Sequence, residues 1–245
     1  MVRHVAHRLR DVVSGMARGV APGVVYDVAE AVSGMVAGVM TVDELMAVQP
    51  VIPVLTVERV EDAAELAAVL VAAGLPVLEV TLRTAAALDV IRAMSAVKGA
   101  IAGAGTVLTS NDVMLAREAG AQFIVTPGLS ASAVAAAREQ ALPILPGVAT
   151  ATELMAGLDL GLTRFKFFPA EQAGGVAMLA ALAGPFAKVK FCPTGGITEK
   201  SAAAYLALPN VACIGGGWLA PKKLVDAKDW SAISALAKTA AALKR

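Results

Sequence analysis

Short apolar runs alternate with helix-like segments along most of the chain. The runs begin near Val51, Pro76, Ala100, Gln122, Pro143, Arg164, Lys188 and Val211. Segments with helical periodicity lie between them, for example 60–73, 85–97, 111–119, 131–140 and 152–158, and a last one covers 230–244. Apolar strands that alternate with helices are typical of right-handed βαβ units and of a parallel sheet buried on both faces.

Eight such units are what a (β/α)8 TIM barrel requires, so we predict a single α/β barrel domain over residues 41–245. An open doubly wound sheet is the competing architecture, but regular units without an obvious topological break favour closure.

Residues 1–40 differ from the rest of the chain, because their arginines, few acids and small residues follow no clear period. We predict that they form a poorly ordered N-terminal extension, and that Thr41 or Asp43 caps a short helix at the start of the domain.

Composition and charge narrow the partners of the protein. The chain has 245 residues and a net charge of +1, with Lys and Arg scattered singly, so we expect no nucleic-acid partner. No apolar run reaches the roughly 18 to 20 residues of a spanning helix, so we expect no membrane partner either. Cys192 and Cys213 lie in strand-like runs and are typical of buried residues in a reducing compartment, which indicates a cytoplasmic protein.

The distribution of histidine excludes several kinds of active site. Both histidines, His4 and His7, lie among the first ten residues. The Ser-His-Asp triad, the Cys-His pair and histidine-ligated zinc are therefore excluded from the domain itself. Acid–base work must fall to carboxylates, lysine or water, and we expect neither a metal nor a cofactor.

A lysine interrupts the apolar run 164–169. In a strand, Lys166 would lie on the opposite face from Phe165 and Phe167. Burial without a partner favours the neutral amine, and a neutral amine is the nucleophile from which a Schiff base forms. The alternative is a lysine whose stem lines the strand while its ammonium reaches solvent.

Polar residues close several of the predicted strands, and in barrels the chemistry gathers at these ends. Alternation places Glu79, Thr81 and Arg83 on one face of their strand. A simple ion pair between Glu79 and Arg83 is as good an interpretation of this face as a catalytic role. The next strand ends in Thr106, whose hydroxyl can donate to a ligand, whereas the segment around Pro127 is also typical of a turn.

Glycine-rich loops follow the last two predicted strands. They read Thr194-Gly195-Gly196 and Gly215-Gly216-Gly217. Backbone N–H groups at such loops and at helix N-termini bind anions, and the loops after strands seven and eight form the usual phosphate site of a barrel. The pair of loops therefore favours a phosphorylated ligand, although tight turns alone are the alternative.

From about Met40 to its end, the chain resembles the bacterial 2-keto-3-deoxy-6-phosphogluconate (KDPG) aldolases, which also act as 4-hydroxy-2-oxoglutarate aldolases. The resemblance rests on five segments spread over the whole domain: 78–84, 103–108, 120–123, 165–170 and 191–197. Residues 1–39 lie outside it. The resemblance supports the predicted barrel and implies a homotrimer, because barrels of this family are commonly trimeric.

The resemblance also implies an activity. A class I, metal-free aldolase would cleave a phosphorylated 2-oxo sugar acid to pyruvate and glyceraldehyde 3-phosphate. Lys166 would form the Schiff base, and Glu79 would be the general acid/base that moves protons through a water. The substrate would be bound by Arg83 and Thr106 at its carboxylate, by Phe168 and Pro127 as walls, and by Thr194, Gly195, Gly196, Gly216 and Gly217 at its phosphate.

One departure from the family pattern bears on the choice of substrate. Many relatives carry Ser or Thr where this chain has Gly217. We expect catalysis to be retained, with weaker phosphate affinity or a different preference between C4 epimers. The galactonate-derived epimer and unphosphorylated 4-hydroxy-2-oxoglutarate are therefore alternatives within the class. A phosphate-binding isomerase or epimerase barrel and a non-catalytic trimeric scaffold are alternatives from other classes.

Overall fold

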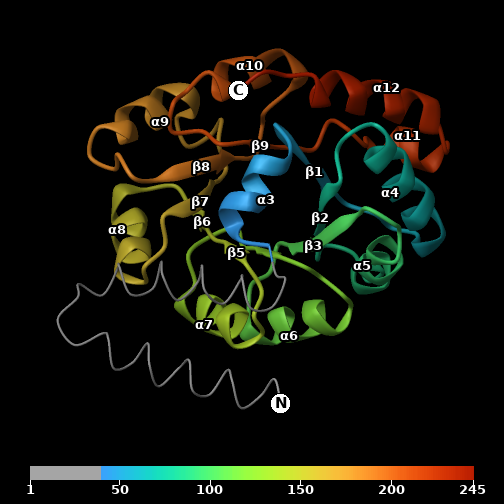
Figure 1. Ribbon diagram of the computed structural model, residues 1–245, viewed down its shortest axis with the longest axis horizontal. Helices are drawn as coiled ribbons and strands as arrows, with labels where there is room; N and C mark the ends of the chain where they lie inside the picture. Colours follow the sequence, from blue (N-terminus) through green and yellow to red (C-terminus); the bar gives the residue numbers. More distant parts are fainter. Residues whose placement is uncertain (1–39) are drawn as a thin grey trace.

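The computed structural model describes residues 40–245 of the chain. The predicted extension, residues 1–40, lies outside the described residues except for Met40, so its expected poor order stays a prediction. The described residues form parallel strands that alternate with helices, and this confirms the α/β class. The helices make a ring around the strands (Figure 1).

The strands form a parallel sheet that curls round like a barrel. They are β1 (Val51–Leu55), β2 (Val77–Thr81), β3 (Ile101–Gly105), β4 (Ile124–Val125), β5 (Ile144–Leu145), β6 (Gly147–Val148), β7 (Arg164–Phe167), β8 (Lys190–Pro193) and β9 (Ile214–Gly216). Two ladders run in the orders β5-β4-β3-β2-β1-β9 and β6-β7-β8. Only Pro146 separates β5 from β6, and the isolated bridge between Thr194 and Gly215 joins the end of β8 to β9.

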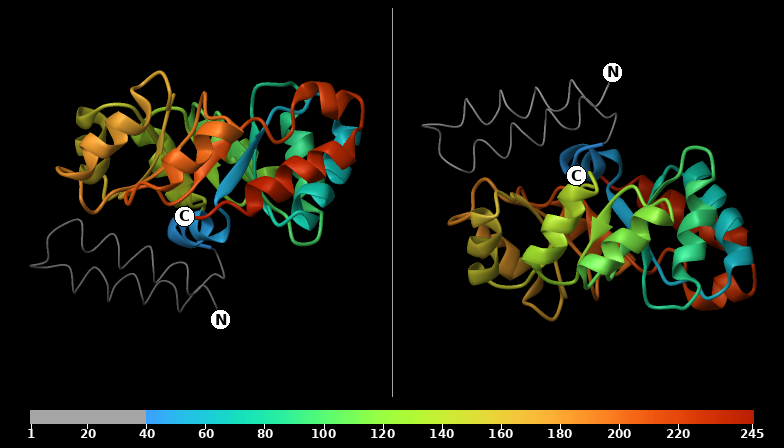
Figure 2. Two further views of the ribbon diagram at one scale, coloured as in Figure 1. Left: turned by 90° about the horizontal axis from the view of Figure 1, so that it is seen from above. Right: turned by 90° about the horizontal axis from the view of Figure 1, so that it is seen from below.

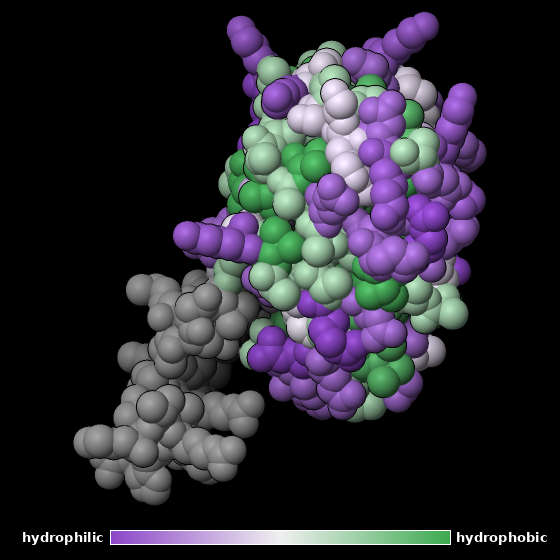
Figure 3. Space-filling view, turned by 90° about the vertical axis from the view of Figure 1, so that its right-hand side faces the viewer, coloured by the Kyte–Doolittle hydropathy of each residue, from purple (hydrophilic) through white to green (hydrophobic). Residues whose placement is uncertain are grey.

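The outer layer consists of helices that follow the strands. They are α4 (Ala63–Ala72), α5 (Ala87–Ser95), α6 (Ser110–Glu118), α7 (Ala131–Glu139), α8 (Ala151–Asp159), α9 (Gly175–Ala183), α10 (Glu199–Leu206), α11 (Lys222–Asp226) and α12 (Trp230–Ala241), with a 3-10 turn, η1 (Val60–Asp62), before α4. The segments with helical periodicity coincide with α4 to α8 and α12. Hydrophilic and apolar surface alternate on one side of this layer (Figure 3).

A short helix, α3 (Val42–Val48), closes the end of the sheet where the strands begin. The Thr41 hydroxyl accepts from the Glu44 N–H in a capping box, which confirms the prediction that Thr41 caps a short helix. Leu45 and Met46 pack among inward-facing side chains of the strands. The Gln49 side chain then bonds to the backbone of Val51 and Val77, so it ties α3 to two strands. In both views of Figure 2, α3 projects from one side of the ring.

Both cysteines lie in the apolar cluster beneath α3 and are free thiols. A hydrogen bond with Cys192, together with burial, raises the pKa of the Cys213 thiol well above its usual value. Only the thiolate reacts with alkylating reagents, so the Cys213 thiol should be inert to iodoacetamide in the native protein at neutral pH. Cys192 should be protected too, because it is buried and the reagent cannot reach it. Mass spectrometry should show both labelled only in denaturant, and rapid native labelling would contradict this prediction.

Two strand ends differ from the sequence-based expectation. The run 77–83 was predicted to alternate throughout, but β2 ends at Thr81 and the chain turns, with the Arg83 N–H donating to the Thr81 carbonyl at 2.8 Å. Arg83 therefore leaves the sheet instead of sharing a strand face with Glu79. Likewise β7 ends at Phe167, before a cis peptide bond between Phe168 and Pro169.

Within the described residues, no helix has both the length and the apolar character needed to cross a membrane.

Candidate active site

Lys166 and Glu79 form a buried pair inside the curled sheet. Lys166 comes from β7 and Glu79 from β2, and the Lys166 Nζ donates to the Glu79 Oε1 at 2.9 Å. Their side chains are only 6% and 4% exposed. An ammonium that reaches solvent is therefore the wrong interpretation of Lys166. The ion pair between Glu79 and Arg83 is wrong as well, because the carboxylate is engaged by the lysine. A buried amine next to a carboxylate can give its proton to that carboxylate, and an amine must lose a proton before it can act as a nucleophile.

Gly105, the last residue of β3, makes room for this pair. A Cβ at position 105 would lie 2.3 Å from the Glu79 Oε1 and 2.6 Å from its Cγ. In the ladder, Gly105 lies opposite Thr81, two residues beyond Glu79. The space that a side chain would fill at position 105 is therefore taken by the Glu79 carboxylate. The missing side chain is thus required for the position of Glu79.

Phe168 contacts Lys166 directly, and Pro127 lies next to Gly147, the ladder partner of Lys166. The Lys166 Nζ is 5.2 Å from the centroid of the Phe168 ring, a distance at which a cation and an aromatic face attract. A Cβ at Gly195 would lie 3.2 Å from the same ring, so Phe168 separates Lys166 from the glycine loop. Gly147 pairs with Lys166 in the ladder, and a Cβ there would lie 2.2 Å from the Pro127 carbonyl oxygen.

Arg83 and Thr106 meet at the mouth of the curled sheet, the open end at which the strands finish. The Arg83 Nε donates to the Thr106 Oγ1 at 3.2 Å, and the guanidinium is exposed. Among residues 40–245 Arg83 has no carboxylate partner, so its charge is available to an anionic ligand. Thr106 has a φ of 57°, a conformation that costs a residue with a Cβ and that often occurs at ligand-binding positions.

The loop after β8 presents unpaired backbone donors. Gly195 and Gly196 have φ angles of 104° and 77°, and neither of their N–H groups donates to another described residue. Successive amides of this kind can bind an anion. Thr194 contributes differently, because it is buried and its hydroxyl donates to the Cys192 carbonyl at 3.4 Å. A Cβ at Gly215 would lie 2.2 Å from the Thr194 Oγ1, so this hydroxyl points into the sheet.

The glycines after β9 differ from each other. A Cβ at Gly216 would lie 2.6 Å from the Trp218 ring and 2.8 Å from the Val51 side chain, so no side chain fits there. Gly217 is exposed, and a Cβ would have only the Val54 carbonyl oxygen near it, at 4.0 Å. Position 217 therefore has room for a side chain that this chain does not supply.

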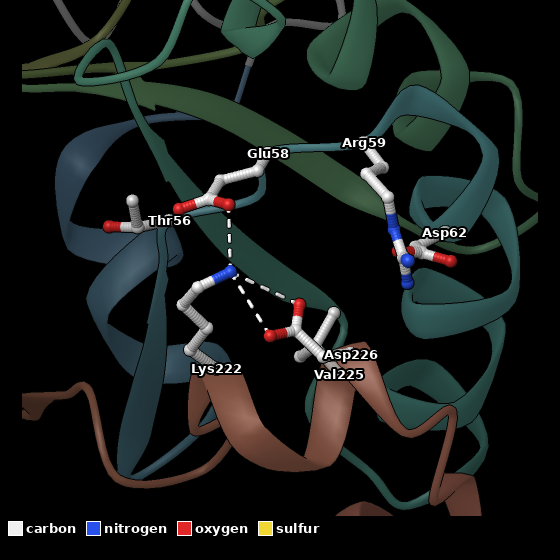
Figure 4. A pocket seen from close by; sticks show the side chains of 7 residues that line it. All are labelled: Thr56, Glu58, Arg59, Asp62, Lys222, Val225 and Asp226. Carbon is white, nitrogen blue, oxygen red and sulfur yellow. Dashed lines mark hydrogen bonds and ion pairs between the residues drawn. The ribbon is translucent and has the colours of Figure 1, made fainter.

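A small hollow lies between the segment after β1 and α11 (Figure 4). It is lined by Thr56, Glu58, Arg59, Asp62, Lys222, Val225 and Asp226. The Lys222 Nζ lies 2.7 Å from Glu58 and 3.1 Å from Asp226, so its charge is already compensated. Within residues 40–245, no group of three His, Cys, Asp or Glu side chains is arranged to hold a metal ion.

Several known proteins of similar sequence and fold are aldolases. Residues 42–236 match the model of the KDPG and KHG aldolase family. The match covers most of the chain, and the chain belongs to this family.

Two relatives and one solved structure illustrate the similarity. The chain is 51% identical to the 2-dehydro-3-deoxy-phosphogluconate aldolase of Zymomonas mobilis over 83% of this chain and 97% of that protein. It is 50% identical to the KHG/KDPG aldolase of Escherichia coli K12 over 81% and 93% of the two chains. A crystal structure of a KDPG aldolase from Legionella pneumophila, with pyruvate captured at low pH as a covalent carbinolamine intermediate, superposes with a TM-score of 0.79. That structure is 43% identical, over 82% of this chain and 98% of its own.

Two hydroxyl residues at the mouth were not among the predicted site residues. Thr81 follows Glu79 by two positions on β2, and the Thr56 Oγ1 lies 2.9 Å from the Thr81 Oγ1. The sequence did contain a signal, because Thr56 is the first polar residue after the first predicted strand. Chemistry in parallel barrels gathers at that position.

Proposed function

We propose that this protein is a class I aldolase that cleaves KDPG to pyruvate and glyceraldehyde 3-phosphate. It would also cleave 4-hydroxy-2-oxoglutarate to pyruvate and glyoxylate. The observation that carries this proposal is the contact of 2.9 Å between the Lys166 Nζ and the Glu79 Oε1 inside the curled sheet. Membership of the KDPG and KHG aldolase family supports it. The covalent carbinolamine of the Legionella pneumophila enzyme supports an amine nucleophile.

The reaction begins when Lys166 transfers its proton to Glu79 and attacks the C2 carbonyl of the substrate. Glu79 returns this proton to the hydroxyl of the carbinolamine, which leaves as water and gives a protonated imine, so Glu79 is a carboxylate again. Glu79, acting through a water, then removes the proton of the C4 hydroxyl, and the C3–C4 bond breaks. Its electron pair moves into the imine and gives an enamine, while C4 becomes the aldehyde carbon. Protonation of the enamine at C3 and hydrolysis release pyruvate and free Lys166.

The two ends of the substrate would bind to opposite sides of the mouth. Arg83 and Thr106 would hold the carboxylate of the pyruvate half, with Phe168 and Pro127 as walls. The N–H groups of Gly195 and Gly196, which donate to no residue among 40–245, support phosphate binding at the other end. There the loop shaped by Thr194 would be completed by Gly216 and Gly217.

We further propose that residues 41–245 form a closed (β/α)8 barrel, that residues 1–40 are an extension, and that the enzyme is a cytoplasmic homotrimer. The curled sheet and the bridge between β8 and β9 support closure. Exposed apolar side chains, such as Leu108 at 60% and Met155 at 61%, support burial of part of the outer layer between subunits. The molar mass of the protein, measured by light scattering after size-exclusion chromatography, tests whether it is a trimer.

The test of the activity is reductive trapping. Protein incubated with pyruvate and sodium borohydride should gain one pyruvate-derived adduct on the peptide that contains Lys166. Pyruvate release from KDPG, from its C4 epimer and from 4-hydroxy-2-oxoglutarate would rank the substrates. Turnover that is unchanged by a chelator would support a mechanism without a metal. Absence of an adduct from folded protein would remove the aldolase mechanism and leave an isomerase or a scaffold as the alternative.

Gly217→Ser tests the phosphate end of the site. The open position accepts the side chain, and its hydroxyl adds one donor to the phosphate. We expect KM for KDPG to fall by about 3- to 10-fold, since one such hydrogen bond contributes roughly 1 kcal/mol or more. KM for unphosphorylated 4-hydroxy-2-oxoglutarate should not change. Gly217→Ala is the control, and an equal effect of Ala would contradict the role of the hydroxyl.

A further inference from the structure

Thr56 directly follows β1, and the bonding of its hydroxyl is fixed by its neighbours. The Thr56 Oγ1 lies 2.9 Å from the Thr81 Oγ1. Thr81 is buried, and its own hydroxyl donates to the Leu55 carbonyl at 3.0 Å. The three groups therefore form a short chain of hydrogen bonds that runs from the backbone of β1 to the mouth.

This chain determines which group can donate. A threonine hydroxyl has one proton and two lone pairs. Because the Thr81 proton is given to the Leu55 carbonyl, Thr56 must be the donor in the contact with Thr81. Its proton is then engaged, and its oxygen presents only lone pairs to the mouth. Thr56 is thus an oriented acceptor, suited to a ligand hydroxyl and unsuited to a phosphate or a carboxylate.

Thr56 lies between the two ends of the proposed substrate site. The ladder runs β9-β1-β2-β3, so β1 separates the Gly217 loop from the strands that carry Glu79 and Thr106. Val54 pairs with Glu79 in the sheet. Thr56 is two residues beyond Val54, so it lies about 6.6 Å closer to the mouth than the level of Glu79. On the other side, the open position of Gly217 faces the Val54 carbonyl. The Thr56 hydroxyl points away from the Glu58–Lys222 ion pair (Figure 4), so it is not part of that cluster.

We propose that Thr56 is a specificity-determining residue whose Oγ1 accepts a hydrogen bond from the C5 hydroxyl of KDPG. This hydroxyl belongs to the aldehyde half, between the bond that breaks and the phosphate. The inference rests on the proposed aldolase function. Thr56 would thus contact the middle of the substrate, whereas the anion-binding groups of the site contact its two ends.

Thr56→Val removes the hydroxyl and keeps the shape. We expect kcat/KM for KDPG to fall by about 10-fold, the size of one neutral hydrogen bond. 4-Hydroxy-2-oxoglutarate has a carboxylate where KDPG has its C5 hydroxyl carbon, so its kcat/KM should stay within about twofold. Thr56→Ser should restore activity on KDPG. Thr239→Val is the matched control, because Thr239 is exposed on α12 and its hydroxyl is likewise engaged as a donor, in its case to the Ala235 carbonyl.

The outcomes separate this inference from the proposed function. Equal losses on both substrates, or no loss on either, would overturn the assignment of Thr56 while the pyruvate adduct of the wild-type protein still formed. A wild-type protein that forms no adduct and cleaves neither substrate would remove the proposed function, and the assignment of Thr56 with it. A loss confined to KDPG, with rescue by serine, supports the inference.

Discussion

Lys166→Ala should abolish both the cleavage of KDPG and the covalent capture of pyruvate. Without the amine no imine forms, and the electron pair released from the C3–C4 bond has no acceptor. We expect a fall in kcat on the order of 10⁶-fold, the scale reached when a covalent nucleophile is removed. A coupled assay of pyruvate release measures the loss, and mass spectrometry after borohydride reduction measures the capture.

Two further variants keep this result interpretable. Lys188→Ala removes an exposed lysine just before β8 and should leave activity and capture unchanged. Lys166→Ala also leaves the buried Glu79 carboxylate without a partner, which can cost about 3–5 kcal/mol of stability. Lys166→Gln retains a hydrogen-bond donor for Glu79 and should be equally inactive while folded. Appreciable capture by either Lys166 variant would place the nucleophile elsewhere.

Glu79→Gln should slow the reaction strongly while the fold is retained. The amide is close in shape to the carboxylate but cannot take up a proton, so transfers to and from Lys166 and the C4 hydroxyl lose their base. Loss of general acid–base catalysis corresponds to about a 10²- to 10⁴-fold fall in kcat. The rate of pyruvate capture should fall as well, and quenched-flow trapping follows it.

Glu65→Gln on α4 serves as the control, because Glu65 is exposed and lies on the outer layer. It should leave kcat unchanged. Circular dichroism must show that Glu79→Gln is folded, since Lys166 loses its buried partner. Near-normal turnover by a folded Glu79→Gln protein would remove Glu79 from the mechanism.

The succession of strands and helices could be predicted from the sequence, because it depends on local patterns. Each strand of this sheet is buried on both faces, so it appears as an apolar run of a few residues. Thr41 carries a complete local signal, a capping box, and the structure confirms it. The end of β2 carries no such signal, because Leu82 continues the alternation although the chain turns after Thr81.

The contacts of the site depended on information that no local pattern contains. Glu79 and Lys166 are 87 positions apart and meet only because the sheet curls. From the residues alone, an ion pair between Glu79 and Arg83 was as good an interpretation as a catalytic role, and Lys166 was connected with Glu79 only by the family resemblance. The φ of 57° at Thr106 likewise follows from tertiary constraints that override the intrinsic preference of threonine.

Gly105 and Gly217 differ in how far the site tolerates a substitution. At position 105 the volume is occupied by the Glu79 carboxylate, so nearly every substitution there would displace the acid–base group. At position 217 the volume is empty, so substitutions there need not disturb the groups that break the bond. The fold therefore permits divergence in which aldehydes are accepted while it holds the pyruvate chemistry constant. New substrate ranges in this lineage are accessible by single changes at the phosphate end.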